Sequence, residues 1–336
     1  MVFITSLLLA LALTPAAIFI APKIGAVDIP KDNRRMHNIP MPRFGGSAIF
    51  VGATASIAIF LVPENPRMVG ILICGALIYI LGLVDDIRGM SAKVKFLGQV
   101  VVGCAAFGIG VRINFIQLFF APESGYTFFS GLSALILTVA WIVGVTNTIN
   151  LIDGLDGLAS GVTIIASLSI AYAAFITSGQ EAGSLSMLAL AGAALGFLPF
   201  NFHPAKIFMG DGGALFLGFM FASLSIEGAT KSATVVAIVA PVLVLGVPIF
   251  DTAFAILRRM INKRPIMEAD KGHLHHRIMA AGFGQKRAVL MLYGISGVMG
   301  LAAVLLSDRL YVEAVALTVI AATLIYVFLT GSGDKK

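Results

Sequence analysis

Acidic, amide, basic and imidazole side chains stand at the ends of long apolar segments of this chain, and their types are those used in phosphoryl chemistry. A charged side chain beside hydrocarbon is costly unless it is hydrated, paired or bound to a cation, so this concentration of charge indicates a functional site. Carboxylate and amide oxygens suit Mg²⁺, and cationic donors suit phosphate. The candidate site residues are Asp85, Asp86, Lys93, Lys95, Asn147, Asn150, Asp153, Asp156, Phe208, Asp211, His273, His275, His276 and Arg277.

The adjacent acids Asp85 and Asp86 follow an apolar segment that we expect to end at residue 84. Adjacent side chains on a helix point about 100° apart, so both acids can serve one site only if the helix frays there. Gly89 provides a place for the helix to fray. A lone pair of acids is commonly a solvated helix end, but beside the other acids we interpret this pair as catalytic.

A second group of polar residues, Asn147, Asn150, Asp153 and Asp156, recurs every three positions. On a helix, this spacing places neighbours about one turn apart on one face, so two amides and two carboxylates would face a common site. Helix capping explains one or two of these residues but not four in phase. We therefore expect the amides to bind substrate and the carboxylates to take part in catalysis.

The sequence Phe-Met-Gly-Asp-Gly-Gly, which contains Asp211, opens a later apolar segment. An aspartate at such a place is commonly an N-cap, but the glycines also allow a phosphate to approach the backbone. Phe208, three residues before the aspartate, could stack on a planar base. These features indicate a further candidate element of a phosphate site.

Three histidines and an arginine form the cluster His273-Leu274-His275-His276-Arg277. No cysteine or His-Glu-x-x-His pattern stands nearby, so the sequence does not indicate zinc. Histidine and arginine donors fit a clamp for phosphate oxygens better. The enrichment of cytosolic loops in Lys and Arg explains the arginine but not the three histidines.

The composition is that of a membrane protein. Of 336 residues, 58% are hydrophobic and only 12% are charged, and the mean hydropathy is +0.97. These values exclude a soluble globular domain. The pairs Gly157 and Gly161, and Gly192 and Gly196, have the spacing at which membrane helices pack closely through small residues.

A helix needs about 20 apolar residues to cross a membrane. We predict an all-α, polytopic fold with about eleven transmembrane helices in a single domain, residues 1–336. The first helix is expected to be retained, because no positive residues precede it as in a cleaved signal peptide. The predicted helices span residues 2–22, 46–62, 69–84, 94–110, 132–149, 157–177, 185–200, 213–229, 233–256, 288–306 and 310–329.

The distribution of Lys and Arg predicts the orientation of these helices, because cytosolic loops are enriched in both. With the amino terminus outside and the carboxyl terminus in the cytosol, only four of the 23 Lys and Arg residues lie outside, namely Arg67, Arg112, Lys231 and Arg309. All candidate site residues then lie on the cytosolic face. The outer loop 111–131, rich in phenylalanine, is expected to lie in the membrane interface.

Motifs along nearly the whole chain carry a resemblance to a known family. They are Pro42-Arg43-Phe44-Gly45-Gly46, Asp85-Asp86, Lys93-x-Lys95-Phe96-x-x-Gln99, Asn150-Leu151-Ile152-Asp153-Gly154-Leu155-Asp156-Gly157-Leu158, Phe208-Met209-Gly210-Asp211, Val247-Pro248-Ile249-Phe250-Asp251 and the histidine cluster. In this order they resemble the polyprenyl-phosphate N-acetylhexosamine-1-phosphate transferases, and within them the bacterial WecA/TagO branch.

The resemblance implies transfer of a sugar 1-phosphate from a UDP-sugar to a polyprenyl phosphate, with release of UMP. It implies Mg²⁺ as cofactor, with Mn²⁺ as an alternative ion, held by Asp211, and uracil stacked on Phe208. The partners are then the UDP-sugar, the polyprenyl phosphate lipid and the bilayer. No nucleic acid is expected, and a homodimer is left open. The implied location is the bacterial cytoplasmic membrane, where the product would begin a cell-envelope polysaccharide such as lipopolysaccharide or teichoic acid.

The histidine cluster bears on the identity of the sugar. Relatives that transfer phospho-MurNAc-pentapeptide carry three consecutive histidines, whereas this chain has His-Leu-His-His-Arg, which resembles the WecA/TagO branch and favours UDP-GlcNAc. The resemblance to that branch implies undecaprenyl phosphate as the acceptor. Transfer of phospho-MurNAc-pentapeptide or of another UDP-HexNAc is the alternative within the family. Lys93, Lys95 and the histidine cluster would compensate phosphate charge. Deprotonation of the lipid phosphate by Asp85, and a covalent route through Asp85 or Asp86, are both left open.

Two alternatives come from other functional classes. An ion-coupled transporter would also cluster acids in a membrane, but its site should lie near the bilayer midplane between sequence repeats. Here the acids are predicted at inner helix ends, and the sequence has no evident internal repeat. A structural scaffold protein would show no metal dependence.

Overall fold

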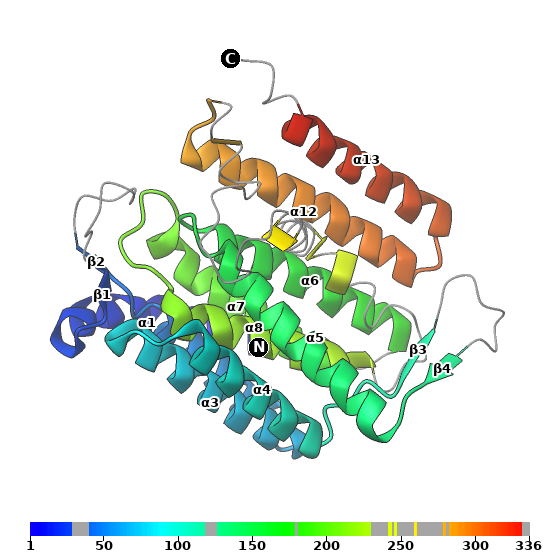
Figure 1. Ribbon diagram of the computed structural model, residues 1–336, viewed down its shortest axis with the longest axis horizontal. Helices are drawn as coiled ribbons and strands as arrows, with labels where there is room; N and C mark the ends of the chain where they lie inside the picture. Colours follow the sequence, from blue (N-terminus) through cyan, green and yellow to red (C-terminus); the bar gives the residue numbers. More distant parts are fainter. Residues whose placement is uncertain are drawn as a thin grey trace.

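The computed structural model describes residues 1–28, 40–117, 126–178, 181–229 and 282–330, with the short pieces 241–243, 245–246, 259–260 and 278–279. In this part of the chain, long helices make up nearly all of the regular structure (Figure 1). The helices are α1 (Val2–Ile24), α2 (Gly46–Phe60), α3 (Arg67–Arg88), α4 (Ala92–Gly108), α5 (Gly131–Ile152), α6 (Leu158–Ser178), α7 (Glu181–Asn201), α8 (Gly210–Ala229), α12 (Gln285–Ser307) and α13 (Tyr311–Thr330).

The helices agree with the prediction of an all-α membrane protein. Every predicted segment except 233–256 overlaps one of them, and most of 233–256 falls outside the described residues. Within the described residues, six helices are long and apolar enough to cross a membrane, namely α1, α3, α5, α6, α7 and α12. The chain is therefore a multi-pass membrane protein, while the number of eleven spans and their orientation stay predictions.

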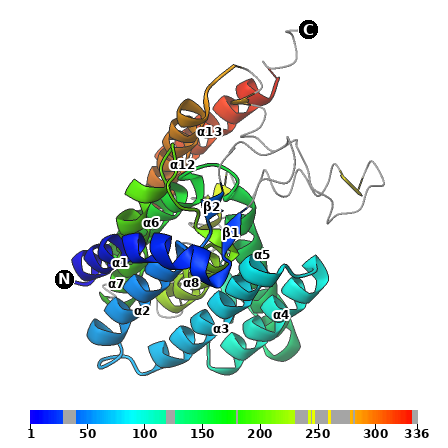
Figure 2. The same ribbon diagram turned by 90° about the vertical axis from the view of Figure 1, so that its left-hand side faces the viewer.

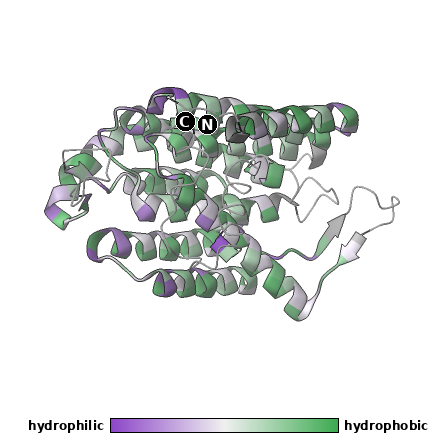
Figure 3. Ribbon diagram, turned by 45° about the horizontal axis from the view of Figure 1, so that its top comes forward, coloured by the Kyte–Doolittle hydropathy of each residue, from purple (hydrophilic) through white to green (hydrophobic). Residues whose placement is uncertain are grey.

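Helix α8 forms the centre of the bundle. It packs against α2, α3, α5 and α7, and the side chains of Phe216, Phe219 and Phe221 are fully buried. A helix that is apolar on all sides is buried either in a protein core or in lipid, and the buried phenylalanines place α8 among neighbouring helices. In Figures 1 and 2, α12 and α13 lie on one side of α8, and α3 and α4 lie on the other. Hydrophobic residues dominate the helices of both sides (Figure 3).

Helix α3 extends beyond the apolar segment from which it was predicted. It ends at Arg88, and Gly89, with a φ of 70°, follows it. The expectation that the helix frays at Asp85 and Asp86 is wrong, because both residues lie within α3. The apolar run marks where the helix leaves hydrocarbon, whereas the backbone hydrogen bonds continue until a glycine in the left-handed region ends them.

Two short antiparallel strand pairs were not predicted. In the first, β1 (Val27–Asp28) pairs with β2 (Met41–Pro42). In the second, β3 (Phe115–Gln117) pairs with β4 (Tyr126–Phe128) within residues 111–131, the loop predicted to lie outside. Strands of two or three residues are too short to show an alternating pattern in the sequence. The first pair matters for the site, because it leads directly to Arg43.

The predicted close packing through Gly192 and Gly196 is confirmed. A Cβ atom at Gly192 would lie 2.2 Å from Ser6 Oγ, and one at Gly196 would lie 2.3 Å from the Leu7 carbonyl oxygen. Helix α7 therefore contacts α1 at a distance that only glycine permits.

Candidate functional site

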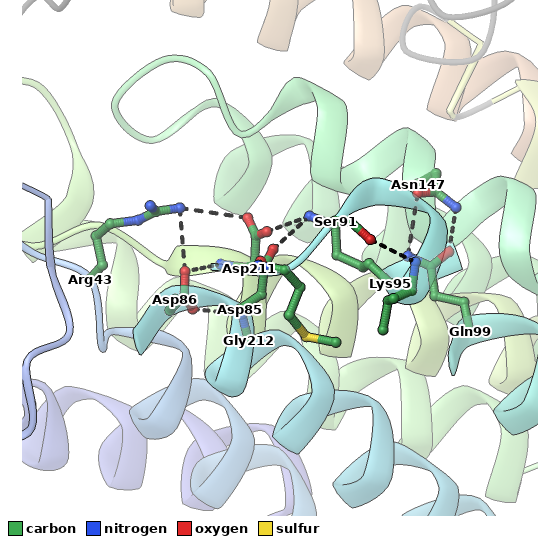
Figure 4. A network of polar contacts seen from close by, with 11 residues as sticks. Arg43, Asp85, Asp86, Ser91, Lys95, Gln99, Asn147, Asp211 and Gly212 are labelled. Carbon is green, nitrogen blue, oxygen red and sulfur yellow. Dashed lines mark hydrogen bonds and ion pairs between the residues drawn. The ribbon is translucent and has the colours of Figure 1, made fainter. Parts of the chain in front are cut away.

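Five charged side chains from four segments of the chain meet where α3 ends and α8 begins (Figure 4). Lys95 Nζ lies 2.8 Å from Asp85 Oδ2 and 2.5 Å from Asp211 Oδ2. Arg43 Nη2 lies 3.3 Å from Asp86 Oδ1 and 3.6 Å from Asp211 Oδ1. We call these five residues the ionic cluster. Three carboxylates face two cations, so the cluster carries an excess of negative charge when all five groups are ionised.

Asp86 fixes the start of α8. Its side chain is only 2% exposed, and its two oxygens accept hydrogen bonds from the backbone N–H groups of Asp211 and Gly212, both at 2.9 Å. N–H groups in the first turn of a helix have no partner within the helix, and the helix dipole favours a negative charge at this end. Asp86 thus caps α8 from a neighbouring helix, and Asp211 is not the N-cap.

Glycines allow the backbones around the ionic cluster to approach each other. A Cβ atom at Gly82 of α3 would lie 2.5 Å from the carbonyl oxygen of Asp211. A Cβ atom at Gly46 would lie 2.3 Å from the backbone nitrogen of Gly213. A larger residue at either position would push α8 away from α3 or from α2. The placement of Asp211 therefore depends on these contacts.

A pair of amides holds α4, which carries Lys95, against α5. Gln99, one turn after Lys95, exchanges hydrogen bonds between its carboxamide and that of Asn147. Asn147 Nδ2 also donates to the Val143 carbonyl oxygen at 2.8 Å. The side chain of Asn147, which we predicted to bind substrate, is thus engaged in helix packing beside Lys95 (Figure 4). Lys93 is exposed, and an offset of two residues turns it about 200° around the helix from Lys95.

The four polar residues from Asn147 to Asp156 do not share one helix face, so that prediction is wrong. Helix α5 ends at Ile152, Asp153 is its C-cap, and a turn leads to α6 at Leu158. The three-residue spacing fixes a common face only while the helix continues. Asn150 is half-buried in the last turn of α5.

Asp153 lies within electrostatic reach of the ionic cluster. Burial, and after it the negative charge of Asp211, raises the pKa of Asp153 well above its ordinary value. Asp86 and Asp156 act in the same direction, and Arg43 opposes them. Several carboxylates that raise one another's pKa form a site in which a cation or a proton is favoured.

Asp156 holds the segment between α7 and α8. Its side chain is 3% exposed, and Oδ2 lies 2.9 Å from His203 Nδ1 and accepts a hydrogen bond from the Ala205 N–H at 3.1 Å. This segment leads to Phe208 and Asp211. His203 was missed in the sequence, since a single histidine between apolar segments belongs to no recognisable motif.

Phe208 lies beside the segment that carries Arg43. Its backbone N–H donates to the Pro42 carbonyl oxygen at 2.8 Å, and its carbonyl oxygen accepts from the Gly45 N–H at 3.0 Å. The ring is half-buried three residues before Asp211. The structure therefore brings the predicted base-stacking residue next to the ionic cluster, and its role stays a prediction.

Arg43 is the residue of the ionic cluster that the site prediction omitted. It stood in the sequence only as a member of the Pro42 to Gly46 motif and as one of many cations expected in cytosolic loops. Its place is set by long-range backbone contacts, since its N–H donates to the Ala26 carbonyl oxygen at 2.8 Å. His273, His275, His276 and Arg277 lie outside the described residues, so their predicted roles stay predictions.

The donor set of the ionic cluster fits a magnesium ion that a substrate helps to hold. Asp85 and Asp211 converge on a single cationic group, Lys95 Nζ. Among the described residues, no three His, Cys, Asp or Glu side chains are arranged to hold a metal by themselves. Mg²⁺ typically binds one or two carboxylates and takes its other ligands from water and phosphate, so two converging carboxylates are sufficient.

Comparison with known proteins gives a consistent result. Residues 68–229 match the family model described as glycosyl transferase family 4. The chain is 47% identical over 306 residues to a probable undecaprenyl-phosphate N-acetylglucosaminyl 1-phosphate transferase of Bacillus subtilis (strain 168), covering 91% of this chain and 84% of the relative.

More distant relatives include two kinds of transferase. A decaprenyl-phosphate N-acetylglucosaminephosphotransferase of Mycobacterium tuberculosis (strain CDC 1551 / Oshkosh) is 35% identical over 82% of this chain and 74% of its own length. A phospho-N-acetylmuramoyl-pentapeptide-transferase of Moorella thermoacetica is 34% identical over 78% of this chain and 82% of its own length. Every residue of the ionic cluster except Arg43 lies within the matched range 68–229.

Proposed function

Because the chain belongs to glycosyl transferase family 4, the polyprenyl-phosphate N-acetylhexosamine-1-phosphate transferases, we propose that it transfers GlcNAc 1-phosphate from UDP-GlcNAc to undecaprenyl phosphate. UMP is released, and the product is the first lipid-linked intermediate of a cell-envelope polysaccharide. The observation that carries the proposal is the ionic cluster, in which Asp85, Asp211 and Lys95 meet at the buried cap of α8. The 47% identical relative supports GlcNAc as the sugar.

The proposed reaction is a single in-line displacement at phosphorus. An oxygen of the lipid phosphate attacks the β-phosphorus of UDP-GlcNAc, and the bond from that phosphorus to the oxygen bridging the two phosphates breaks. The bond electrons leave with UMP. The second pKa of a phosphate monoester is about 6, so the attacking oxygen needs no base near neutral pH. This chain then has to bind and align three phosphates, which is a task of positioning and charge compensation.

The cations of the ionic cluster suit that task. Lys95 and Arg43 lie on different sides of Asp211 and can exchange carboxylate partners for phosphate oxygens (Figure 4). Arg43 presents a planar group with several donors, whereas Lys95 acts as a point charge. Asp86 stays with the backbone of α8 and preserves the position of Asp211 during this exchange.

Asp211 and Asp85 are the residues that would hold Mg²⁺. Bound there, the ion would neutralise part of the charge of the diphosphate as UMP departs. Charge balance supports such a cation, because among the described residues of the ionic cluster a diphosphate would approach three carboxylates compensated by two cations. Mn²⁺ prefers the same oxygen ligands and would serve as a substitute.

The proposed site faces the cytosol of a bacterium, in a chain of about eleven spans in the cytoplasmic membrane. The asymmetry of Lys and Arg supports this orientation, since it would place only four of the 23 on the outer side. The ionic cluster lies where α3 ends and α4 and α8 begin, beside the segment that carries Arg43, and UDP-GlcNAc, a water-soluble donor, could reach it there.

The test uses purified protein in detergent with UDP-GlcNAc, undecaprenyl phosphate and Mg²⁺. UMP release that requires all three supports the proposal. Faster release from UDP-MurNAc-pentapeptide would favour the alternative represented by the 34% identical relative. Absence of lipid-dependent UMP release from either donor would contradict the proposed reaction class and leave a transporter or scaffold function.

A further inference from the structure

Tyr293 of α12 inserts into the turn between α5 and α6. Its hydroxyl donates a hydrogen bond to the Gly157 carbonyl oxygen at 2.5 Å. Its ring occupies the space beside Gly161, where a Cβ atom would lie 2.0 Å from the ring carbon that bears the hydroxyl. The two glycines, Gly157 and Gly161, which the sequence suggested as a surface for helix packing, thus make room for the side chain of one tyrosine. We call the space at these two glycines the seat of Tyr293.

The seat of Tyr293 connects to the segment that leads to Phe208. The Gly157 N–H donates to Asn201 Oδ1 at 3.1 Å, and Ser160 Oγ donates to the same oxygen at 3.1 Å. Asn201 Nδ2 in turn donates to the Ile207 carbonyl oxygen at 3.0 Å. A chain of hydrogen bonds therefore leads from Tyr293 through Gly157 and Asn201 to Ile207, the residue before Phe208. We call this chain of hydrogen bonds the relay.

The relay is buried and conformationally constrained. Asn201 is 2% exposed, and its carboxamide makes three hydrogen bonds, so it has little freedom to turn. Gly157 has a φ of 80°, a conformation that glycine adopts without strain. The Gly157 carbonyl oxygen accepts from the Tyr293 hydroxyl and from the Gly161 N–H, the latter at 2.9 Å. Loss of the tyrosine bond would therefore leave this turn held by one hydrogen bond in place of two, and would loosen the N–H group that orients Asn201.

We propose that Tyr293 is a positioning residue for the transfer reaction, acting through Gly157 and Asn201 on the segment that presents Phe208 and Asp211. This inference rests on the proposed function. Tyr293 hydrogen-bonds to Gly157 and packs against Gly161, which are not members of the ionic cluster, so we infer that its effect is indirect. Helix α12, which packs against α6 (Figure 1), would then also help to position the residues proposed to bind UDP-GlcNAc.

The first test is Tyr293→Phe, which removes only the hydroxyl, compared with Ser169→Ala. Ser169 lies at the same interface of α6 and α12, where a Cβ atom at Gly300 would lie 2.4 Å from its Oγ, and its hydroxyl donates only to the Ile165 carbonyl oxygen. Both variants remove one hydroxyl from one interface. Only Tyr293→Phe interrupts the relay.

We expect Tyr293→Phe to lower kcat/KM for UDP-GlcNAc by about threefold to tenfold, the range that corresponds to one neutral hydrogen bond. KM for undecaprenyl phosphate should be unchanged, and Ser169→Ala should match wild type for both substrates. The proposal would be overturned if Tyr293→Phe showed wild-type kinetics. It would also be overturned if KM rose equally for UDP-GlcNAc and for undecaprenyl phosphate. A lower unfolding temperature without a kinetic change would also overturn it, since it would show a purely structural role.

A second variant perturbs the seat from the opposite side. Gly161→Ala places a methyl group where the Tyr293 ring lies, whereas Gly294→Ala, next to Tyr293 on the same helix, meets no atom within 4 Å. Gly161→Ala should reproduce the selective loss for UDP-GlcNAc, and Gly294→Ala should not. Equal behaviour of the two variants would contradict the role of the seat.

Hydrogen–deuterium exchange separates this inference from the proposed function. Peptides covering residues 153–161 and 201–209 should exchange faster in Tyr293→Phe than in Ser169→Ala, whether or not the enzyme turns over UDP-GlcNAc. Inactivity of the wild-type protein would refute the proposed function alone. Unchanged exchange in both peptides would refute the relay itself.

Discussion

Replacement of Asp86 by asparagine is expected to destabilise the fold as well as to impair turnover. The substitution converts one carboxylate oxygen to an amide NH₂ group, so one of the two N–H groups of α8, at Asp211 or Gly212, loses its acceptor. A buried N–H without a partner costs about 1–3 kcal/mol. The lost ion pair with Arg43 adds little, because the Arg43 side chain is 33% exposed and solvent screens the pair. The expected loss of stability is therefore about 1–3 kcal/mol.

Asp85→Asn is the matched control. The Asp85 side chain is 12% exposed, the remaining oxygen can still accept from the Met90 N–H, and Lys95 keeps Asp211 as partner. We expect this neighbour substitution to cost less stability than Asp86→Asn while it reduces turnover, because the Met90 N–H keeps an acceptor and Lys95 keeps a carboxylate partner.

Thermal unfolding of both variants in detergent, with UMP release measured on the same samples, distinguishes the two residues. A lower unfolding midpoint is expected for Asp86→Asn and a midpoint close to wild type for Asp85→Asn. Equal midpoints for Asp86→Asn and wild type would show that Asp86 does not hold the start of α8.

Three further outcomes follow from the site. Asp211→Asn should abolish turnover while the protein remains folded, because an amide brings no net charge to Mg²⁺; near-normal activity at saturating Mg²⁺ would exclude this assignment. Phe208→Ala should weaken UMP binding in calorimetry by about 1–3 kcal/mol, the scale of stacking between a base and an aromatic ring, and unchanged binding would show that the ring only packs. Direct attack by the lipid phosphate should invert the configuration of a chirally labelled β-phosphate, whereas retention would indicate a covalent intermediate on Asp85 or Asp86.

The sequence predicted the helices well because hydropathy reports burial in hydrocarbon directly. It predicted the end of α3 poorly, since Asp85 to Arg88 continue the helix after the apolar run has stopped. It also assigned Asn147 to Asp156 to one helix face, although Asp153 already ends α5. Periodicity detects a regular element and cannot indicate the residue at which backbone geometry changes.

The composition of the site was partly predictable. Asp85, Asp86, Lys95 and Asp211 were found because charged groups at the ends of apolar segments are rare and costly. The different roles of Asp85 and Asp86 could not be predicted, because they depend on the neighbours that the fold places beside each side chain. Asp85 contacts Lys95, whereas Asp86 accepts from the backbone of α8. Arg43, too, is placed by contacts distant in sequence.

The same limit applies to the glycine pairs. Their spacing correctly indicated close approach of another element at Gly192 and Gly196, where α7 meets the backbone of α1. At Gly161 the neighbour is the side chain of Tyr293 from α12. A glycine in the sequence indicates that another part of the protein lies close to it. Only the fold shows whether that part is a backbone or a side chain.

The central claim is that this chain joins GlcNAc 1-phosphate to a polyprenyl phosphate. Mass spectrometry of the lipid extract after incubation of purified protein with UDP-GlcNAc, undecaprenyl phosphate and Mg²⁺ tests it most directly. We expect undecaprenyl diphosphate-GlcNAc to accumulate in equal amount to UMP, and neither product to form with the Asp211→Asn protein. UMP without the lipid-linked diphosphate, or the same products from the Asp211→Asn protein, would contradict the proposed reaction at this site.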